Sequence, residues 1–218
     1  MPKYVYPPRP RSQFYPNELP KWEKKGTYVA QRKFNGTRSP IHITADRKVF
    51  VWGRHGEPHK QFNANRDMIA QVLALDLQPG LEYWLDGELL NKCGEKKIAK
   101  TGEKEKIVLY DVLCAGKVLF GGPDQMTRLK MLAQICRCPT KLEPANQIAL
   151  VVSDNIWMAE TWDSDFVQHF EEKKHLDEIE GLFLRKKKSV IYNLGTKEYE
   201  CDWCIRCRKA HAGGLYDH

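Results

Sequence analysis

A lysine beside a glycine is the residue in this sequence best placed to act as a nucleophile. Lys33 closes the apolar run TYVAQRKF and is followed by Asn35 and Gly36, and a glycine there would permit a tight turn. An amine at the end of a strand is well exposed to a ligand and can form a covalent bond with it. Lysines beside turns are also common on protein surfaces, so the other residues of the chain must decide what Lys33 does.

Four further features follow in order along the chain. Asp86-Gly87-Glu88 interrupts one strand-like run, Tyr110-Asp111 closes another, and Glu180-Gly181 opens a third. Arg206-Cys207-Arg208 lies in a final strand-like run. Carboxylates can bind a divalent cation, a tyrosine ring can pack on a base, and arginines can neutralise phosphate. These are the residue types that nucleotidyl transfer to a lysine needs.

In their order and spacing, these features resemble the motifs of the covalent nucleotidyltransferase superfamily, which contains ATP-dependent DNA ligases, RNA ligases and mRNA capping enzymes. Those motifs are a KxDG lysine, a DGE-type carboxylate pair, an aromatic-Asp strand end, an EG-apolar strand and a KxK strand. Arg38, Arg128-Leu129 and the turn Trp52 to Gly56 are similar to features of the DNA ligase branch. The resemblance spans residues 27–209.

The resemblance implies how the nucleotide would be bound. Lys33 would take AMP from ATP as a phosphoramidate and pass it to a 5′-phosphate, after which a 3′-hydroxyl displaces AMP. Tyr110 would stack on adenine, and Gln31 lies where the family reads that base. Glu88 would contact ribose and metal, and Glu180 would bind the catalytic metal, Mg²⁺ or Mn²⁺. The attacking amine must be neutral, which nearby cations favour.

The same resemblance implies which residues would contact phosphate. Arg38 would contact the ribose or the incoming 5′-phosphate, and Arg54 would hold the phosphate at the nick. Arg206 and Arg208 would neutralise charge on the phosphoryl oxygens together with the metal. Arginines stand here where the family has paired lysines, and the two residue types are not interchangeable. Lys209 is one residue out of phase and would face the other way.

Two other departures from the family pattern affect the prediction. Asn35 stands where DNA ligases usually have Asp, and RNA ligases tolerate other residues there, so DNA and RNA substrates are less clearly separated. DNA ligases and capping enzymes usually continue into an OB-fold domain that closes over the nucleotide, and nine residues follow Lys209. The expectation is therefore a minimal enzyme without that lid, or a piece of a longer one.

Short runs rich in β-branched and aromatic residues, separated by Gly, Pro and Asp, predict antiparallel strands from Thr27 onward. Helices are predicted at about 65–75, at 124–136 and within the acidic stretch 163–180. The second helix would bury Met126, Leu129, Leu132 and Ala133. The predicted fold class is α+β, a nucleotidyltransferase (ATP-grasp-like ligase) fold of antiparallel sheets flanked by helices.

The first twenty residues differ from the rest in composition. They contain six of the twelve prolines, which excludes a regular helix or central strand and predicts an extended basic arm over 1–20. Residues 21–218 would then form the adenylation domain. The arm could contact phosphate or pack over the surface as a solvated tail, and the sequence favours neither.

The composition of the chain supports a nucleic-acid partner and an intracellular setting. A net charge of +7 and a pI near 9.0 suit a polyanion. Seven cysteines, an odd number, and no signal-peptide core predict a reducing, cytoplasmic compartment. Cys201, Cys204 and Cys207 with Cys136 and Cys138 could suggest zinc, but strand alternation favours buried thiols. The sequence predicts no membrane span and a monomer.

The basic run Arg185 to Lys188 has two interpretations. It would be a solvated strand edge or, because it follows Glu180 closely, a contact for the nucleic-acid backbone. The predicted function is an ATP-dependent polynucleotide ligase, with DNA nick joining slightly favoured. RNA or mixed RNA/DNA end joining, a GTP-dependent capping guanylyltransferase and a non-catalytic nucleic-acid-binding module are the alternatives. Small ligases without a lid resemble viral enzymes.

Overall fold

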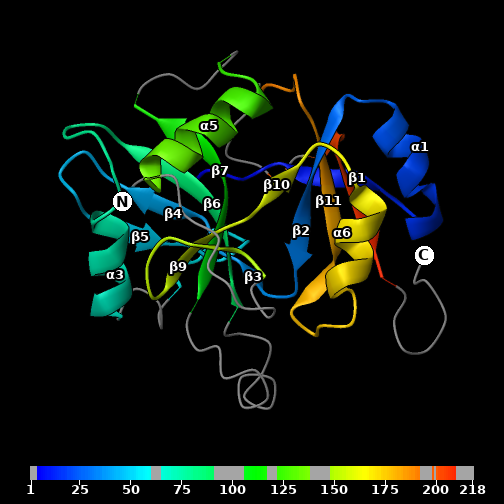
Figure 1. Cartoon of the computed structure of the whole chain (residues 1–218). Helices are drawn as coiled ribbons and strands as arrows, with labels where there is room; N and C mark the ends of the chain where they lie inside the picture. Colours follow the sequence, from blue (N-terminus) through cyan, green and yellow to red (C-terminus); the bar gives the residue numbers. More distant parts are fainter. Residues whose placement is uncertain are drawn as a thin grey trace.

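Two β-sheets lie against each other, with helices beside each of them (Figure 1). The computed structural model describes residues 4–59, 65–90, 106–116, 122–137, 148–191, 198 and 200–209. Each sheet has one face turned toward the other sheet, so side chains from distant parts of the sequence meet between them. The site described below is built on those two facing surfaces.

The five-stranded sheet has the order β1-β12-β11-β2-β10. Its strands are β1 (Arg9–Phe14), β2 (Tyr28–Phe34), β10 (Thr161–Trp162), β11 (Ile179–Lys186) and β12 (Glu200–Arg208). β2, β10, β11 and β12 pair antiparallel, whereas β1 joins β12 in parallel as the edge strand. An edge strand tolerates proline, because its outer N–H groups need no partner in the sheet.

The seven-stranded sheet has the order β5-β4-β6-β7-β9-β8, with β3 paired to β6. Its strands are β3 (Thr37–Arg38), β4 (Ile41–Ile43), β5 (Val49–Val51), β6 (Tyr83–Leu89), β7 (Ile107–Ala115), β8 (Leu150–Val151) and β9 (Ile156–Met158). β7 and β9 are parallel, since the chain between them crosses over through a helix. The expectation of antiparallel pairing throughout is therefore wrong for this pair and for β1.

The described helices are short and amphipathic. They are the 3-10 turn η1 (Pro16–Glu18), α1 (Leu19–Lys24), α3 (Arg66–Leu73), α5 (Gln125–Ile135) and α6 (Phe166–Lys173). The side chains of Asn65 and Asp124 cap α3 and α5 by accepting from the backbone N–H of Met68 and Thr127. Within the described residues, no helix has the length and apolar character needed to cross a bilayer.

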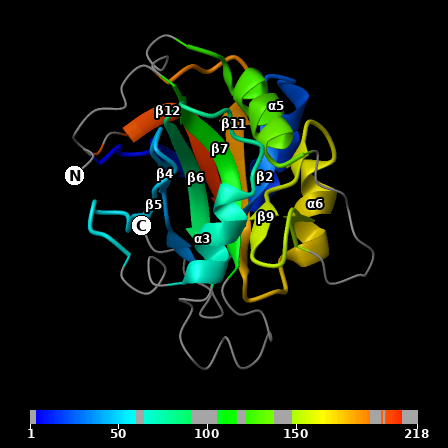
Figure 2. The ribbon, with the colours of Figure 1, turned by 90° about the vertical axis from the view of Figure 1, so that its left-hand side faces the viewer.

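Each pair of helices covers its own sheet. Met68 and Val72 of α3 and Leu132 of α5 pack on the seven-stranded sheet, which Figure 2 views from the side that α3 covers. Phe166 and Phe170 of α6 pack with residues of β2, β11 and β12 on the five-stranded sheet. The outer layers thus bury the apolar faces of both sheets and leave the inner faces to build the site.

The buried face of α5 differs from the predicted one. The buried residues are Gln125, Arg128, Leu132 and Ile135, so only Leu132 of the expected set is confirmed. Two of these buried residues are polar because they bind the carboxylate of Asp111 on β7. A prediction that counted only apolar residues could not find this face.

The N-terminal segment is extended but ordered by pairing. Residues 9–14 form β1, and α1 begins at Leu19, inside the segment predicted as an arm. Pro20 is compatible with a helix there because the first turn has no use for its missing N–H. The arm is thus an edge of the five-stranded sheet, and its role is taken up below.

Candidate active site

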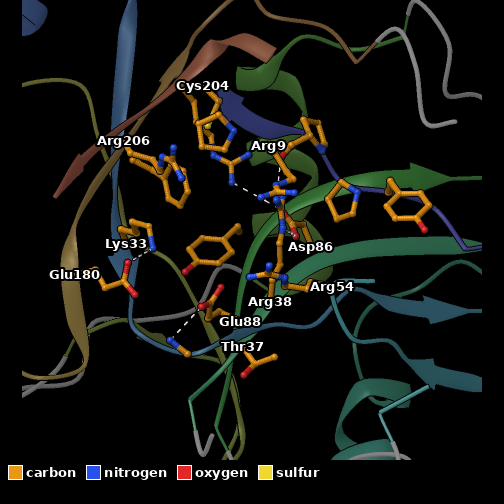
Figure 3. Close-up of a pocket in the computed structure, with 18 of the residues that line it drawn as sticks. Arg9, Lys33, Thr37, Arg38, Arg54, Asp86, Glu88, Glu180, Cys204 and Arg206 are labelled. Atoms are coloured by element: carbon orange, nitrogen blue, oxygen red, sulfur yellow. Dashed lines mark hydrogen bonds and ion pairs between the residues drawn. The ribbon is translucent and has the colours of Figure 1, made fainter. Parts of the chain in front are cut away.

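A cavity of about 310 Å³ lies between the inner faces of the two sheets (Figure 3). Its lining includes Lys33 on β2, Glu88 on β6, Tyr110 on β7 and Glu180 on β11. It also includes the predicted arginines 38, 54, 206 and 208. All the predicted site residues except Gln31 therefore line one cavity of a size typical for small ligands.

The amine of Lys33 contacts the carboxylate of Glu180 from the neighbouring strand. The Lys33 side chain is 12% exposed, so its amine reaches the cavity while its stem is covered. A register shift between Ile179 and Gly181 turns the Glu180 side chain toward Lys33. The strand end therefore presents to the cavity an amine already paired with a carboxylate.

The glycine after Glu180 is required by the backbone at that shift. Gly181 has a φ of +145°, and a Cβ there would lie 1.9 Å from the carbonyl oxygen of Cys207. No other residue fits without moving β12. The two residues of the Glu-Gly pair thus act together, because the glycine allows the close strand approach that turns the glutamate side chain toward Lys33.

The turn after Lys33 brings Glu88 to the opposite wall of the cavity. The backbone N–H of Gly36 donates to Oε1 of Glu88 at 3.1 Å. A Cβ on Gly36 would lie 2.4 Å from the carbonyl oxygen of Leu89, so a close backbone approach requires this glycine. Burial raises the pKa of the Glu88 carboxyl to about 7, although Lys33, Arg38 and the Gly36 N–H act in the opposite direction.

Arg38 is held by two contacts. Its guanidinium makes a bidentate pair with Asp86, with Nε to Oδ1 at 2.9 Å and Nη2 to Oδ2 at 2.7 Å. Its third nitrogen, Nη1, donates to the carbonyl oxygen of Pro8 at 2.9 Å. Arg38 lines the cavity as predicted, and its pairing with the first carboxylate of Asp86-Gly87-Glu88 leaves Glu88 as the carboxylate that faces the ligand space.

Tyr110 presents its ring to the cavity and is otherwise enclosed. It is 3% exposed, and its hydroxyl accepts from the backbone N–H of Phe34 at 3.4 Å. Burial raises the pKa of the Tyr110 phenol well above its ordinary value, so the ring stays neutral. A neutral, immobilised ring is suited to stacking on a base, which remains a prediction for this residue.

Gln31 lies deeper than the other predicted residues. It is fully buried on β2, and its amide Nε2 donates to Oγ1 of Thr161 at 3.0 Å and to the carbonyl oxygen of Tyr110 at 3.3 Å. Its Oε1 is buried without a hydrogen-bond partner among the described residues. Gln31 is thus behind Tyr110 and outside the cavity lining, and its part in reading the base stays a prediction.

Arg206 and Arg208 enter the cavity from β12. Nε of Arg208 lies 3.6 Å from Oε2 of Glu180. Burial lowers the pKa of Arg206, and the charges of Arg208 and Arg9 lower it further. Nε of Arg206 is buried with no hydrogen-bond partner in the described part of the chain. Crowded cations with open donors form a site for an anion such as phosphate.

Two further predicted positions are placed at the margin of the site. Arg54 is exposed on the loop after β5 and lines the cavity, where its Nε donates to the ring of His55 at 2.9 Å. Lys209 faces away as predicted, because its amine donates to the carbonyl oxygen of Leu176 at 2.6 Å. Lys209 therefore cannot replace the arginines of β12.

Arg185 lines the cavity, a position that neither interpretation of the basic run Arg185 to Lys188 had named. It is 5% exposed rather than at a solvated strand edge, and its Nη1 contacts Oδ2 of Asp111 at 3.1 Å. Arg128 binds the same carboxylate through Nε and Nη2. The only available sign was its position in the Glu-Gly strand, five residues after Glu180, because alternation along a strand does not show which charged residue is buried.

The thiols behave as buried residues. Cys114, Cys136, Cys201, Cys204 and Cys207 are all buried and unoxidised. Among the described residues, no three His, Cys, Asp or Glu side chains gather to hold a metal ion by themselves. The expected burial is therefore confirmed for Cys136, Cys201, Cys204 and Cys207, and Cys138 lies outside the described residues.

Glu88 and Glu180 nevertheless fit a metal that a ligand helps to bind. Mg²⁺ is usually held by one or two carboxylates together with phosphate oxygens and water, so a cage of three protein ligands is not needed. Both carboxylates line the cavity, with Lys33 and the arginines arranged around it. The residues present suit a divalent ion shared with a phosphate ligand.

Comparisons with known proteins identify the fold. The sequence matches no protein-family model and no curated protein. The ligase domain of LigD from M. tuberculosis aligns with a TM-score of 0.54 at 14% identity, covering 82% of this chain and 52% of that one. Mycobacterial DNA ligase D complexed with ATP and MES aligns with a TM-score of 0.56 at 14% identity, covering 83% of this chain and 54% of that one.

A third solved structure covers more of both chains. The ATP-dependent DNA ligase of bacteriophage T7, in complex with ATP, aligns with a TM-score of 0.55 at 12% identity, covering 94% of this chain and 69% of that one. The chain spans about half the length of the two mycobacterial structures. These likenesses confirm the predicted α+β fold, that of the nucleotidyltransferase domain of ATP-dependent ligases.

Proposed function

We propose that this chain is an ATP-dependent polynucleotide ligase that works through a covalent lysine-AMP intermediate. The observation that carries the proposal is the pairing of Lys33 with Glu180 in a cavity that also holds Glu88, Tyr110 and the arginines. The fold supports it, since two of the similar ligases were solved with ATP bound. Fold alone does not assign chemistry, so the proposal rests on the site.

The first step would use the Lys33 amine. Its lone pair attacks the α-phosphorus of ATP, a nitrogen–phosphorus bond forms, and the bond from phosphorus to the bridging oxygen of the β-phosphate breaks. Pyrophosphate leaves with that electron pair. Glu180 contacts the amine and is placed to receive its proton. Mg²⁺ or Mn²⁺ at Glu88 and Glu180 would neutralise charge on the phosphoryl oxygens.

The later steps would transfer the same AMP to a nucleic-acid end. A 5′-phosphate oxygen attacks the phosphoramidate and releases the Lys33 amine, and a 3′-hydroxyl then attacks that phosphate and releases AMP. Arg54 is exposed at the cavity rim, where a strand end could reach it. DNA nick joining is favoured over RNA joining by the Asp86-Gly87-Glu88, Arg38 and Arg54 features, whereas Asn35 leaves RNA as the second candidate.

The decisive experiment is covalent labelling. The protein is incubated with α-labelled ATP and Mg²⁺, and label is followed through denaturing electrophoresis. Wild type and a Lys21→Ala control, changed on the exposed face of α1, should carry label, and Lys33→Ala should not. Label retained in Lys33→Ala would overturn the assignment, and label from GTP alone would favour a capping enzyme.

A second experiment addresses the substrate. Nicked duplexes in which each side of the nick is either DNA or RNA are sealed under the same conditions, giving four combinations. Sealing of the all-DNA nick at the highest rate supports the favoured assignment. A preference for a 3′-RNA strand would move the assignment to RNA or mixed end joining.

A further inference from the structure

The N-terminal arm spans the cavity from one sheet to the other. At its start, the Tyr4 ring packs on Trp52 and Trp84 of the seven-stranded sheet, with ring centroids 5.7 and 6.0 Å apart. At its end, β1 pairs with β12 of the five-stranded sheet, where Gln13 is opposite Arg206. The residues between these two anchors therefore run over the cavity.

This crossing segment is a fixed part of the wall. It contains Pro7, Pro8 and Pro10, all of which line the cavity, and proline fixes one backbone dihedral at each position. The carbonyl oxygen of Pro8 accepts from Nη1 of Arg38 at 2.9 Å, which ties the segment to the site itself. These contacts show that the segment is packed against the site, and both interpretations of the arm, packing over the surface and contact with phosphate, are compatible with them.

The segment carries a cation into the cavity at Arg9. Arg9 lines the cavity together with Arg206 and Arg208, and it is 45% exposed. Its described ionic partner is Glu198, which also lies 3.3 Å from Nδ1 of His55. Burial is the main cause of the lowered pKa of Arg206, and the positive charges of Arg208 and then Arg9 lower it further, so the three guanidiniums repel one another.

The strand order gives the positions of these cations relative to Lys33. Across the sheet, Lys33 is on β2, Glu180 on β11, Arg206 on β12 and Arg9 on β1. Arg9 also lies farther along the sheet than Lys33, because Arg9 is opposite Glu200 of β12, whereas Lys33 is opposite Gly181, which is opposite Arg208. Figure 3 shows Arg206 near Lys33 and Glu180, and Arg9 farther across the cavity toward Asp86.

In-line attack separates the nucleophile from the leaving group. If the Lys33 amine attacks the α-phosphorus, the bond that breaks points away from that amine. The β- and γ-phosphates must then extend away from the amine into the cavity, whose lining also includes Arg206 and Arg208 of β12 and Arg9 of β1. A leaving pyrophosphate carries the electron pair of the broken bond and needs such cations.

We propose that Arg9, presented by the N-terminal arm, binds the β- and γ-phosphates of the nucleotide and stabilises pyrophosphate as it leaves. The inference rests on the proposed function, since it assumes a nucleoside triphosphate in this cavity. The arm thereby supplies a phosphate contact from a segment that precedes the catalytic strands. On binding, Arg9 exchanges Glu198 for phosphate oxygens, which a guanidinium can hold with two parallel hydrogen bonds.

The test measures nucleotide affinity without chemistry. In a Lys33→Ala background, the dissociation constants of ATP and AMP are measured with Mg²⁺ by calorimetry. Arg9→Ala should weaken ATP binding about 10- to 100-fold, the effect of one charge-assisted hydrogen bond, and leave AMP binding within about twofold. Arg11→Ala is the matched control, since Arg11 is on the same strand, points to Asp202 and should change neither constant.

A second variant separates phosphate binding from a structural ion pair. Glu198→Gln removes the competitor of Arg9, so ATP affinity should stay the same or rise. If the Arg9 to Glu198 pair only held the arm in place, Glu198→Gln would weaken ATP binding as Arg9→Ala does. That result, or equal weakening of ATP and AMP by Arg9→Ala, would overturn the inference.

The outcome can be distinguished from failure of the proposed function. If wild type forms no adduct with labelled ATP, the ligase assignment fails. If wild type forms the adduct and Arg9→Ala leaves both ATP affinity and the rate of adduct formation unchanged, only the role of Arg9 fails. Arg9→Lys should recover part of the ATP affinity, because lysine keeps the charge but lacks the planar fork.

Discussion

Two groups of charged side chains border the cavity and differ in how completely they are paired. The open group lies on the five-stranded sheet, and its members make few ionic contacts with one another. It consists of Lys33, Glu180, Arg206 and Arg208. The closed group, Arg38, Asp86, Asp111, Arg128 and Arg185, links the two sheets and α5 through hydrogen-bonded ion pairs. Both groups contain residues from the motifs recognised in the sequence.

The carboxylates show what the difference means. Asp86 and Asp111 are each 1% exposed, and Asp111 accepts from Arg128, Arg185 and Gln125. The Glu180 side chain is 27% exposed and has Lys33 and Arg208 as its ionic partners. A carboxylate with all its acceptor positions used cannot exchange partners with a ligand, whereas Glu180 can. The closed group therefore holds the walls and the open group is available for chemistry.

The largest effect is expected from Glu180 in the open group. Glu180→Gln removes the acceptor for the Lys33 amine, and adduct formation with labelled ATP should fall on the order of 10²- to 10⁴-fold. The free energy of unfolding should change by about 1 kcal/mol or less, because a partly exposed pair contributes little to stability. Rapid-quench labelling gives the rate and urea denaturation gives the stability.

If Glu180→Gln unfolded the protein, the division into an open and a closed group would be contradicted. A loss of several kcal/mol there would place Glu180 in the structural group despite its exposure. Glu171→Gln, at an exposed position of α6, provides the control for changing a glutamate in this sheet's covering layer.

The closed group should show the opposite pattern at Asp111. Asp111→Asn leaves Arg128 and Arg185 buried beside a neutral group, and removing one partner of a buried ion pair costs about 3–5 kcal/mol. The urea midpoint should therefore fall sharply. Asp163→Asn, at an exposed position, should leave it unchanged. An unchanged midpoint in Asp111→Asn would show that this network is not structural.

What the sequence alone could predict also differs between the open and the closed group. Lys33, Glu180 and Glu88 were identified because each is marked by a neighbouring glycine, and Gly36 and Gly181 are required by close backbone contacts. Close backbone contacts of this kind can be recognised from the sequence, because they require a glycine next to the site residue. The order of strands, with β1 beside β12, joins residues nearly 200 positions apart and leaves no local sign.

Pairing between charged residues was also beyond local prediction. Arg128 was not among the residues expected on the buried face of its helix, yet it is 3% exposed because the carboxylate of Asp111 compensates its charge. For Arg185 the sequence left open a solvated strand edge or a contact with the nucleic-acid backbone, yet its side chain is buried against the same carboxylate. Which arginine has a buried carboxylate partner depends on the packing of β7, α5 and β11, and not on the residues next to it.

An intermediate effect is expected at Arg206. Arg206→Ala should lower the rate of adduct formation about 10- to 100-fold, the effect of one hydrogen bond to a charged group. The free energy of unfolding of Arg206→Ala should equal or exceed that of wild type, because burial and the charges of Arg208 and Arg9 disfavour the guanidinium in the folded protein. Arg206→Lys should recover part of the activity. A loss of stability in Arg206→Ala would assign Arg206 to the closed group.

The smallest effect is expected at His42, behind the seven-stranded wall. Its ring stacks on Trp84 at 4.3 Å, and Nε2 lies 2.6 Å from Oε1 of Glu82. Burial lowers the pKa of His42 against the opposing effect of Glu82, so the folded protein favours the neutral ring. The stabilisation that His42 contributes should thus be fully present above the unfolded pKa of 6.5 and be lost as the pH falls through the lower pKa of the folded state.

His42→Phe keeps an aromatic ring on Trp84 and removes the titrating group. Thermal unfolding at pH 7.5 and pH 5 should show a smaller acid-induced loss in this variant than in wild type, while His55→Phe, on an exposed loop, should match wild type. An equal loss in His42→Phe would mean that acid acts at a group other than His42.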